Sequence, residues 1–151
     1  MIRKLAAWTA VLAVVAAGLV AVAAPASAAA QCVYIYRISY NSPGTDTRSN
    51  ASLNGEWVQL HNRCRTTGVL TSTRIRDAAG HTYTFGSFVL GGGRYVKVHT
   101  GRGTNTAADR YWGQSAYIWN NDRDTASFYG RTPVLLDRCS YNNPHVLSLF
   151  C

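Results

Sequence analysis

Residues 54–62 read Asn54-Gly-Glu-Trp-Val-Gln-Leu-His-Asn62, a short segment that begins and ends in turn residues. Between the turns, side chains with period two point to opposite sides, as in a half-buried β-strand. Val58 and Leu60 fall on one face, and Trp57 and His61 fall on the other. The stretch therefore predicts a strand that places its valine and leucine in a hydrophobic core.

The same rhythm continues along the chain. Short runs rich in Val, Ile, Thr and Tyr alternate with clusters of Gly, Asn, Asp and Pro, and helical periodicity is absent. This pattern is typical of an all-β domain, and its spacing suits a β-sandwich. We expect strands at 33–40, 56–62, 72–77, 82–85, 94–99, 116–120, 125–129 and 133–139.

Two features refine this prediction. Pro43 and Gly44 predict a turn, because proline fixes φ and glycine is free to adopt a positive φ. In the expected strand 116–120, Ile118 and Trp119 cannot both lie on one face. We expect Trp119 to lie largely in the core, as a large ring in a small sandwich usually does.

The first 28 residues have the features of a secretory signal peptide. Arg3 and Lys4 form a positive start, residues 5–24 are apolar, and a small-x-small pattern ends at Ala28, an arrangement that signal peptidases recognise. We expect cleavage after Ala28, with Ala30 as the alternative. A membrane anchor is the rival interpretation, because about 20 apolar residues can span a bilayer. The alanine-rich run and the missing basic cluster after it favour a secreted protein with no membrane span in its mature chain.

The remaining residues 29–151 are enough for one domain with its own core. The chain has fifteen Lys and Arg against seven Asp and Glu; Arg3 and Lys4 belong to the signal, so thirteen basic residues leave a net charge of +6. Such an excess favours anionic partners such as nucleic acid, teichoic acid or an acidic polysaccharide. Solubility alone is the alternative explanation, since the arginines are scattered along the sequence.

Four cysteines, Cys32, Cys64, Cys139 and Cys151, lie in the expected mature chain. An even number in an exported protein predicts two disulfides, with three pairings open from the sequence alone. If the first two strands pair antiparallel, Cys32 and Cys64 lie opposite each other, within reach of a disulfide. Cys139 and Cys151 then close the C-terminal tail onto the last strand. No Cys-x-x-Cys pair is present, so we expect no zinc, other metal or cofactor.

Several short pieces follow one another in a fixed order, and together they resemble the lamin tail domain, an immunoglobulin-like β-sandwich. Each piece alone is common, whereas the ordered set is specific. The pieces are Ile38-Ser-Tyr-Asn-Ser-Pro-Gly44, Glu56-Trp-Val-Gln-Leu-His-Asn62, Ile75-Arg-Asp77 with Tyr83-Thr-Phe85, Val96-Lys-Val-His-Thr-Gly-Arg-Gly103, Tyr111-Trp-Gly113, Ile118-Trp-Asn-Asn121 and Leu136-Asp-Arg-Cys139.

The resemblance covers residues 33–141 and implies an immunoglobulin-like fold with a binding or scaffolding role and no catalytic residues. Lamin tail domains of nuclear lamins bind DNA and protein partners, and bacterial members often stand beside nuclease or other hydrolase domains in exported proteins. Secreted proteins similar to this one commonly have only the C-terminal disulfide, which supports the same cysteine pairing. One departure is that the family often places a Trp shortly before the position of Asp77, where this chain has Arg74 and Ile75.

Other candidate sites are weaker. His61 and His99 lie on the polar faces of expected strands, where they could approach each other and Glu56 in a metal or acid–base site; two separate surface histidines are the favoured alternative. The tip 120–124 offers oxygen ligands for calcium, but Arg123 and the missing EF-hand glycine favour an ordinary turn.

The best candidate for a ligand site is the loop 101–112. It combines Arg102 and Arg110 with the adjacent rings of Tyr111 and Trp112, and arginine beside aromatic rings can bind sugars or bases. The leading hypothesis is therefore a non-enzymatic secreted binding or scaffold module of unknown partner, such as an extracellular protein. The alternatives are a binder of DNA or an anionic cell-wall polymer, and a small secreted hydrolase, which the scarcity of clustered acidic ligands argues against.

Overall fold

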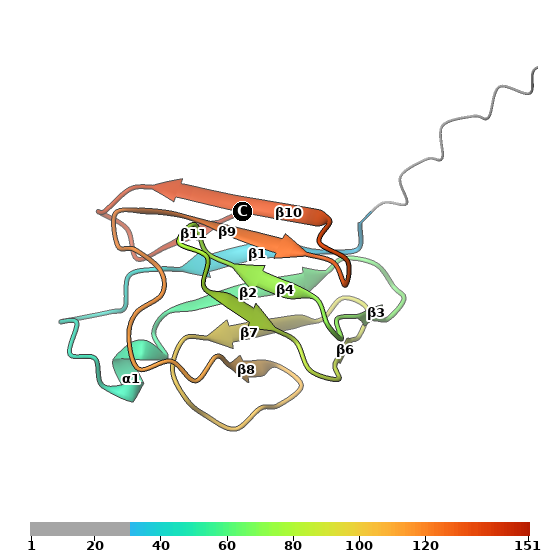
Figure 1. The fold of residues 1–151 in the computed structure, drawn as a ribbon, viewed down its shortest axis with the longest axis horizontal. Coiled ribbons are helices and arrows are strands. Elements are labelled where there is room, and N and C mark those ends of the chain that lie inside the picture. The colour runs from blue at the N-terminus through green and yellow to red at the C-terminus, as the bar shows by residue number, and fades with distance from the viewer. Residues whose placement is uncertain (1–30) are drawn as a thin grey trace, which may run out of the picture.

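Two β-sheets packed against each other form most of the domain (Figure 1). The computed structural model describes residues 31–151, so the expected signal peptide, residues 1–28, lies outside the described residues and stays a prediction. The described chain consists of strands and loops with one four-residue helix, α1 (Asn50–Leu53). The expected all-β fold is therefore confirmed.

The larger sheet has five strands in the order β11-β1-β2-β7-β8, and the second has four in the order β10-β9-β4-β5. A short two-stranded sheet, β3-β6, lies at one end. The strands of the larger sheet are β1 (Val33–Ser39), β2 (Trp57–Asn62), β7 (Tyr95–His99), β8 (Asp109–Tyr111) and β11 (Ser148–Phe150). The others are β4 (Arg74–Arg76), β5 (Thr82–Thr84), β9 (Arg123–Tyr129), β10 (Leu135–Asn142), β3 (Gly68–Val69) and β6 (Val89–Leu90).

The inner faces of the two sheets form the hydrophobic core. Val58 and Leu60 of β2 are fully buried, as are Val96 and Val98 of β7, which confirms the alternation expected from the sequence. Trp119 is buried as well, at 2% exposure. The largest other core side chains are Tyr40, Phe85, Phe128, Ile35, Ile38, Leu60, Leu70, Ile75 and Leu90.

The expected strand 116–120 is wrong, because this segment pairs with no neighbouring strand. A buried carboxyl group takes the place of a strand partner: the N–H of Ile118 donates to Oε2 of Glu56 at 3.1 Å. Freed from strand alternation, Ile118 and Trp119 both enter the core. Burial raises the pKa of Glu56 from 4.5 to about 8, although hydrogen bonds, led by the Ile118 N–H, act in the opposite direction.

Five elements were not expected from the sequence, among them the short strands β3 and β6. The strand β8 pairs parallel with β7, and its residues 109–111 show no apolar alternation. The strand β11 lies beyond the last expected strand and pairs with the outer edge of β1. The helix α1 is a single turn, capped by Ser49, whose side chain accepts from the N–H of Ser52.

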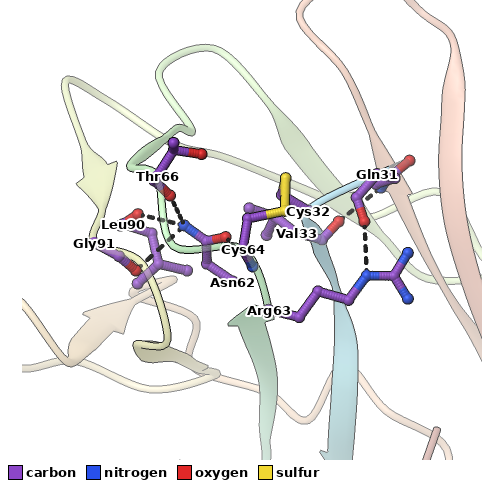
Figure 2. Close-up of a disulfide and its surroundings, with 9 residues drawn as sticks. All are labelled: Gln31, Cys32, Val33, Asn62, Arg63, Cys64, Thr66, Leu90 and Gly91. Atoms are coloured by element: carbon purple, nitrogen blue, oxygen red, sulfur yellow. Dashed lines mark hydrogen bonds between the residues drawn. A yellow bond between two sulfur atoms is a disulfide. The ribbon is translucent and has the colours of Figure 1, made fainter. Parts of the chain in front are cut away.

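The structure has the expected disulfide between Cys32 and Cys64, with a Cα–Cα distance of 5.2 Å. It closes the β1–β2 hairpin, in which Val33 lies opposite Asn62. Figure 2 shows that Asn62 organises the turns beside this disulfide. Its buried amide donates to three backbone carbonyl groups and its oxygen accepts from one N–H, so one side chain ties the hairpin to the β3–β6 end. The partners are the carbonyls of Thr66, Leu90 and Gly91 and the N–H of Cys64.

The second expected disulfide, Cys139–Cys151, is also present, with a Cα–Cα distance of 5.6 Å. Cys139 lies on β10 in one sheet, whereas Cys151 directly follows β11 in the other. The bond therefore joins the two sheets and holds β11 against β1, where the N–H of Cys151 donates to the carbonyl of Tyr36 at 2.9 Å.

Candidate functional site

Four arginines lie on the outward side of the four-stranded sheet. In β4, Ile75 is fully buried, so its neighbours Arg74 and Arg76 point outward. Arg123 begins β9 just before the buried Asp124, and Arg138 of β10 precedes the buried Cys139, so both exposed side chains also lie on the outward side. We call the surface formed by Arg74, Arg76, Arg123 and Arg138 the arginine face.

The strand register aligns part of this face into a row. Arg138 lies opposite Ser127, and Ser127 lies opposite Arg76 on its other side. Two strand spacings separate the arginine backbones, roughly 10 Å. Ser127 is only 7% exposed, as expected for a small side chain flanked by two long ones. A row of cations at this spacing can contact successive charges on an extended anion.

None of the four guanidinium groups forms a salt bridge or a side-chain hydrogen bond within residues 31–151; the ion pairs recorded there both involve histidine. The carboxylates of this sheet are occupied by backbone donors instead. Asp77 accepts from the N–H groups of Gly80 and His81, and Asp124 accepts from that of Ala78. Both aspartates are buried. Asp122, which directly precedes Arg123, is exposed and forms no ion pair with it.

Two hollows open on this face. One has a volume of about 340 Å³ and is lined by Arg74, Arg76, Thr82, Tyr129 and Pro133. The other, of about 390 Å³, is lined in part by Arg123, Thr125 and Ser140. Asp124 also lines it, and its carboxylate accepts from backbone N–H groups. Guanidinium groups and hydroxyls donate hydrogen bonds, and a guanidinium fork matches the geometry of a phosphate or carboxylate. The arrangement can bind anionic groups at two points of one surface.

The residues expected to form a site in the loop 101–112 do not share one surface. Arg110 lies opposite the buried Val98, and its guanidinium carbon lies 3.9 Å from the ring centre of Phe88. Trp112 is half-buried and packs edge-on against Tyr83 and Trp119. Both side chains therefore pack toward the core, because alternate residues of β8 and of the segment directly after it face inward.

The other two loop residues lie elsewhere. Tyr111 stacks on His99 on the outward side, with ring centres 5.0 Å apart. Arg102 is exposed and lines a separate hollow with Arg48 beside α1. Ligand binding by Arg102 or Tyr111 stays a prediction. The four residues of the expected loop site do not lie close enough on one surface to form a single site.

The possible histidine site is not formed. His61 lies opposite Tyr95 and His99 opposite Trp57, so the two are four residues apart along the β2–β7 pair, roughly 13 Å. Glu56 points to the other face of the sheet, into the core. Nowhere in the described chain do three or more His, Cys, Asp or Glu side chains gather as metal ligands.

The tip 120–124 is organised as a turn. Asp124 accepts from the N–H groups of Asn120 and Thr125 and from the amide of Asn120. These donors occupy the oxygens that a calcium ion would need. The tip therefore forms the expected turn.

The arginine face was not expected, because the arginines are scattered along the sequence. Arg138 is 62 residues from Arg76, and only the register of β10, β9 and β4 brings them to one row. A partial signal was present, because Arg74 and Arg76 flank a single isoleucine in an expected strand. That pattern already places both side chains on the outward side.

The two packed sheets define an immunoglobulin-like β-sandwich. Residues 26–143 match the family model of the Lamin Tail Domain, and the chain belongs to this family. Lamin tail domains are non-catalytic immunoglobulin-like modules. No curated protein matches the chain.

Proposed function

We propose that this domain is a secreted, non-catalytic binding module that holds a phosphodiester polymer, such as teichoic acid or DNA, on its arginine face. The observation that carries the proposal is the set of four arginines on one sheet face, three exposed and Arg74 half-buried, without a carboxylate partner. Arginine excess on one surface is the electrostatic footprint of a phosphate-binding protein.

Three further features support it. The hollow beside Arg74 and Arg76 adds the hydroxyl of Thr82 and the ring of Tyr129, which suits a phosphate flanked by a less polar group. Like charges on one face oppose folding, and a ligand that neutralises them removes that cost. Two disulfides are typical of proteins that work in an oxidising, extracellular setting, and no helix among residues 31–151 is long and apolar enough to cross a membrane.

The test is the affinity of residues 29–151 for inorganic polyphosphate, teichoic acid and duplex DNA at several salt concentrations. Arg74→Ala/Arg76→Ala should lower the affinity at least tenfold at low salt. It should also flatten the plot of log affinity against log salt by about two, because each lost phosphate contact removes roughly one released counterion.

The matched control is Arg65→Ala/Arg94→Ala, which removes the same charge from exposed positions outside the arginine face. It should keep most of the affinity and nearly the whole salt slope. An equal loss in both variants would show attraction by net charge alone and overturn the site. If none of the three polymers binds at low salt, the proposed function fails, and the arginines serve solubility. Binding of polyphosphate and teichoic acid without DNA, or the reverse, identifies the natural source of the phosphodiester.

A further inference from the structure

Aromatic side chains gather on the outward side of the other, five-stranded sheet. They come from four strands. Four of the rings pack together, and Trp57 lies beside them through Arg37, whose guanidinium lies over both Trp57 and Phe150. Tyr36 is the central ring, with centres 5.0 Å from Tyr95, 5.3 Å from Phe150 and 6.4 Å from Tyr34. We call the surface formed by Tyr34, Tyr36, Trp57, Tyr95 and Phe150 the aromatic face.

A β-bulge in β1 enriches this face. The pairing with β2 shifts between Ile35 and Arg37, so that Tyr36 and Arg37 together oppose Gln59. Ile35 and Ile38 both stay fully buried on either side of the bulge. Tyr36 and Arg37 both contact Phe150 on the outward side. Two adjacent side chains, those of Tyr36 and Arg37, therefore lie on the same surface, where regular strand alternation would place only one of them.

Cations lie among these rings. The guanidinium carbon of Arg37 is 4.6 Å from the ring centre of Phe150, and Nζ of Lys97 is 4.4 Å from that of Trp57. The neighbouring strand β8 has one carboxylate, that of Asp109. Its Oδ1 lies 2.9 Å from Nε2 of His99, and it forms no salt bridge with Lys97. The aromatic face is therefore apolar and positively charged at once.

Its exposure is unusual for aromatic side chains. Phe150 is 60% exposed and Tyr95 is 39% exposed, whereas rings such as Phe85 and Phe128 are buried in the core. The inter-sheet disulfide at Cys151 fixes the strand on which Phe150 lies. Exposed apolar surface that is held rigid in this way marks a binding site more often than chance.

We propose that the aromatic face binds an acidic polysaccharide, with sugar rings stacked on Tyr95, Tyr36 and Phe150 and the carboxylates of the sugars paired with Arg37 and Lys97. A pyranose ring has an apolar face that suits an aromatic ring and a polar rim that suits the tyrosine hydroxyls. Charge complementarity favours this ligand over two other possible occupants of the aromatic face. A second copy of this chain would place cations against cations, and a neutral glycan would leave Arg37 and Lys97 without partners.

The two sheets pack back to back, so the aromatic face and the arginine face point away from each other. One monomer with both sites occupied would join a polysaccharide to a phosphodiester polymer. This inference stands independently of the proposed function, because the two surfaces share no residue.

The experiment measures binding of polygalacturonate to residues 29–151 in the Arg74→Ala/Arg76→Ala background, which removes the arginine-face contribution. The ringless acidic polymer polyglutamate and the neutral polysaccharide dextran are the comparison ligands. Polygalacturonate should bind at least tenfold more tightly than either. Equal binding of polyglutamate would show that charge alone acts and would overturn the proposal.

Tyr95→Ala/Phe150→Ala should lower polygalacturonate affinity at least tenfold, whereas Val69→Ala/Val89→Ala, which removes similarly exposed apolar side chains at the β3–β6 end, should not. Lys97→Ala provides a second variant and should weaken binding several-fold without removing a ring.

Unchanged affinity in both Tyr95→Ala/Phe150→Ala and Lys97→Ala would overturn the site. Tighter binding of single-stranded poly(dT) than of polygalacturonate, lost in the ring variant, would overturn the ligand class. The function proposed for the arginine face is tested separately, by polyphosphate binding to the chain without these substitutions.

Discussion

Replacing Glu56 by glutamine should make the domain less sensitive to alkaline pH. Glu56 is fully buried, and its burial raises the carboxyl pKa from 4.5 to about 8. The neutral form is therefore the one that the folded state prefers. Its contribution to stability is complete below about pH 4.5, and it is lost as the pH rises toward 8, because ionisation is then favoured in the unfolded chain.

The size of the effect follows from the two pKa values. Each pH unit between 4.5 and 8 is worth about 1.4 kcal/mol, so the full cost of keeping the carboxyl neutral above pH 8 is at most about 5 kcal/mol. That is a large part of the stability of a domain of this size, about 5–15 kcal/mol. Glutamine has the same shape and no charge, so Glu56→Gln removes this cost while its oxygen can still accept from the N–H of Ile118.

The assay is urea unfolding of both proteins at pH 5 and pH 9 with the disulfides intact. Effects of other titrating groups are common to both and cancel in the difference. We expect similar free energies of unfolding at pH 5 and an advantage of several kcal/mol for Glu56→Gln at pH 9. If the difference between the two proteins changes by less than about 1 kcal/mol over this range, Glu56 is not held neutral in the core, and the explanation of the 116–120 segment is wrong.

Two further outcomes follow from the disulfide regions. Asn62→Ala should lower the free energy of unfolding by about 2–3 kcal/mol, because it leaves buried carbonyls such as that of Leu90 without a donor; a loss below 0.5 kcal/mol in urea unfolding would show that water replaces the amide. Cys139→Ser/Cys151→Ser should cost about 3 kcal/mol and should weaken polygalacturonate binding while sparing polyphosphate, since β11 holds Phe150; parallel loss of both ligands would contradict this division.

Much of the fold could be predicted from the sequence, because it depends on local alternation. The burial of Val58 and Leu60 follows from period two alone, and the Cys32–Cys64 pairing follows from one antiparallel hairpin. The prediction of a strand at 116–120 was wrong for a physical reason. Its residues look apolar, but the N–H of Ile118 donates to a buried carboxyl group instead of to a neighbouring strand. No pattern in the sequence indicates that exchange.

The candidate site was predictable only in part, since it depends on which strands are neighbours. Arg110 and Trp112 looked like loop residues, yet the parallel pairing of β8 with β7 turns both toward the core. Conversely, Arg138 joins Arg76 through Ser127 of an intervening strand. The faces of single strands could be assigned from the sequence, whereas the order and register of strands within a sheet could not.

The most direct measurement of the central claim is a map of backbone amide chemical shifts in ¹⁵N-labelled residues 29–151 during titration with polyphosphate. We expect the largest changes along β4, β5, β9 and β10, centred on the amides of Arg74, Arg76 and Arg138, with much smaller changes in the loop 101–112. Changes confined to that loop, or spread evenly over all exposed arginines, would contradict the assignment of the arginine face as the binding surface.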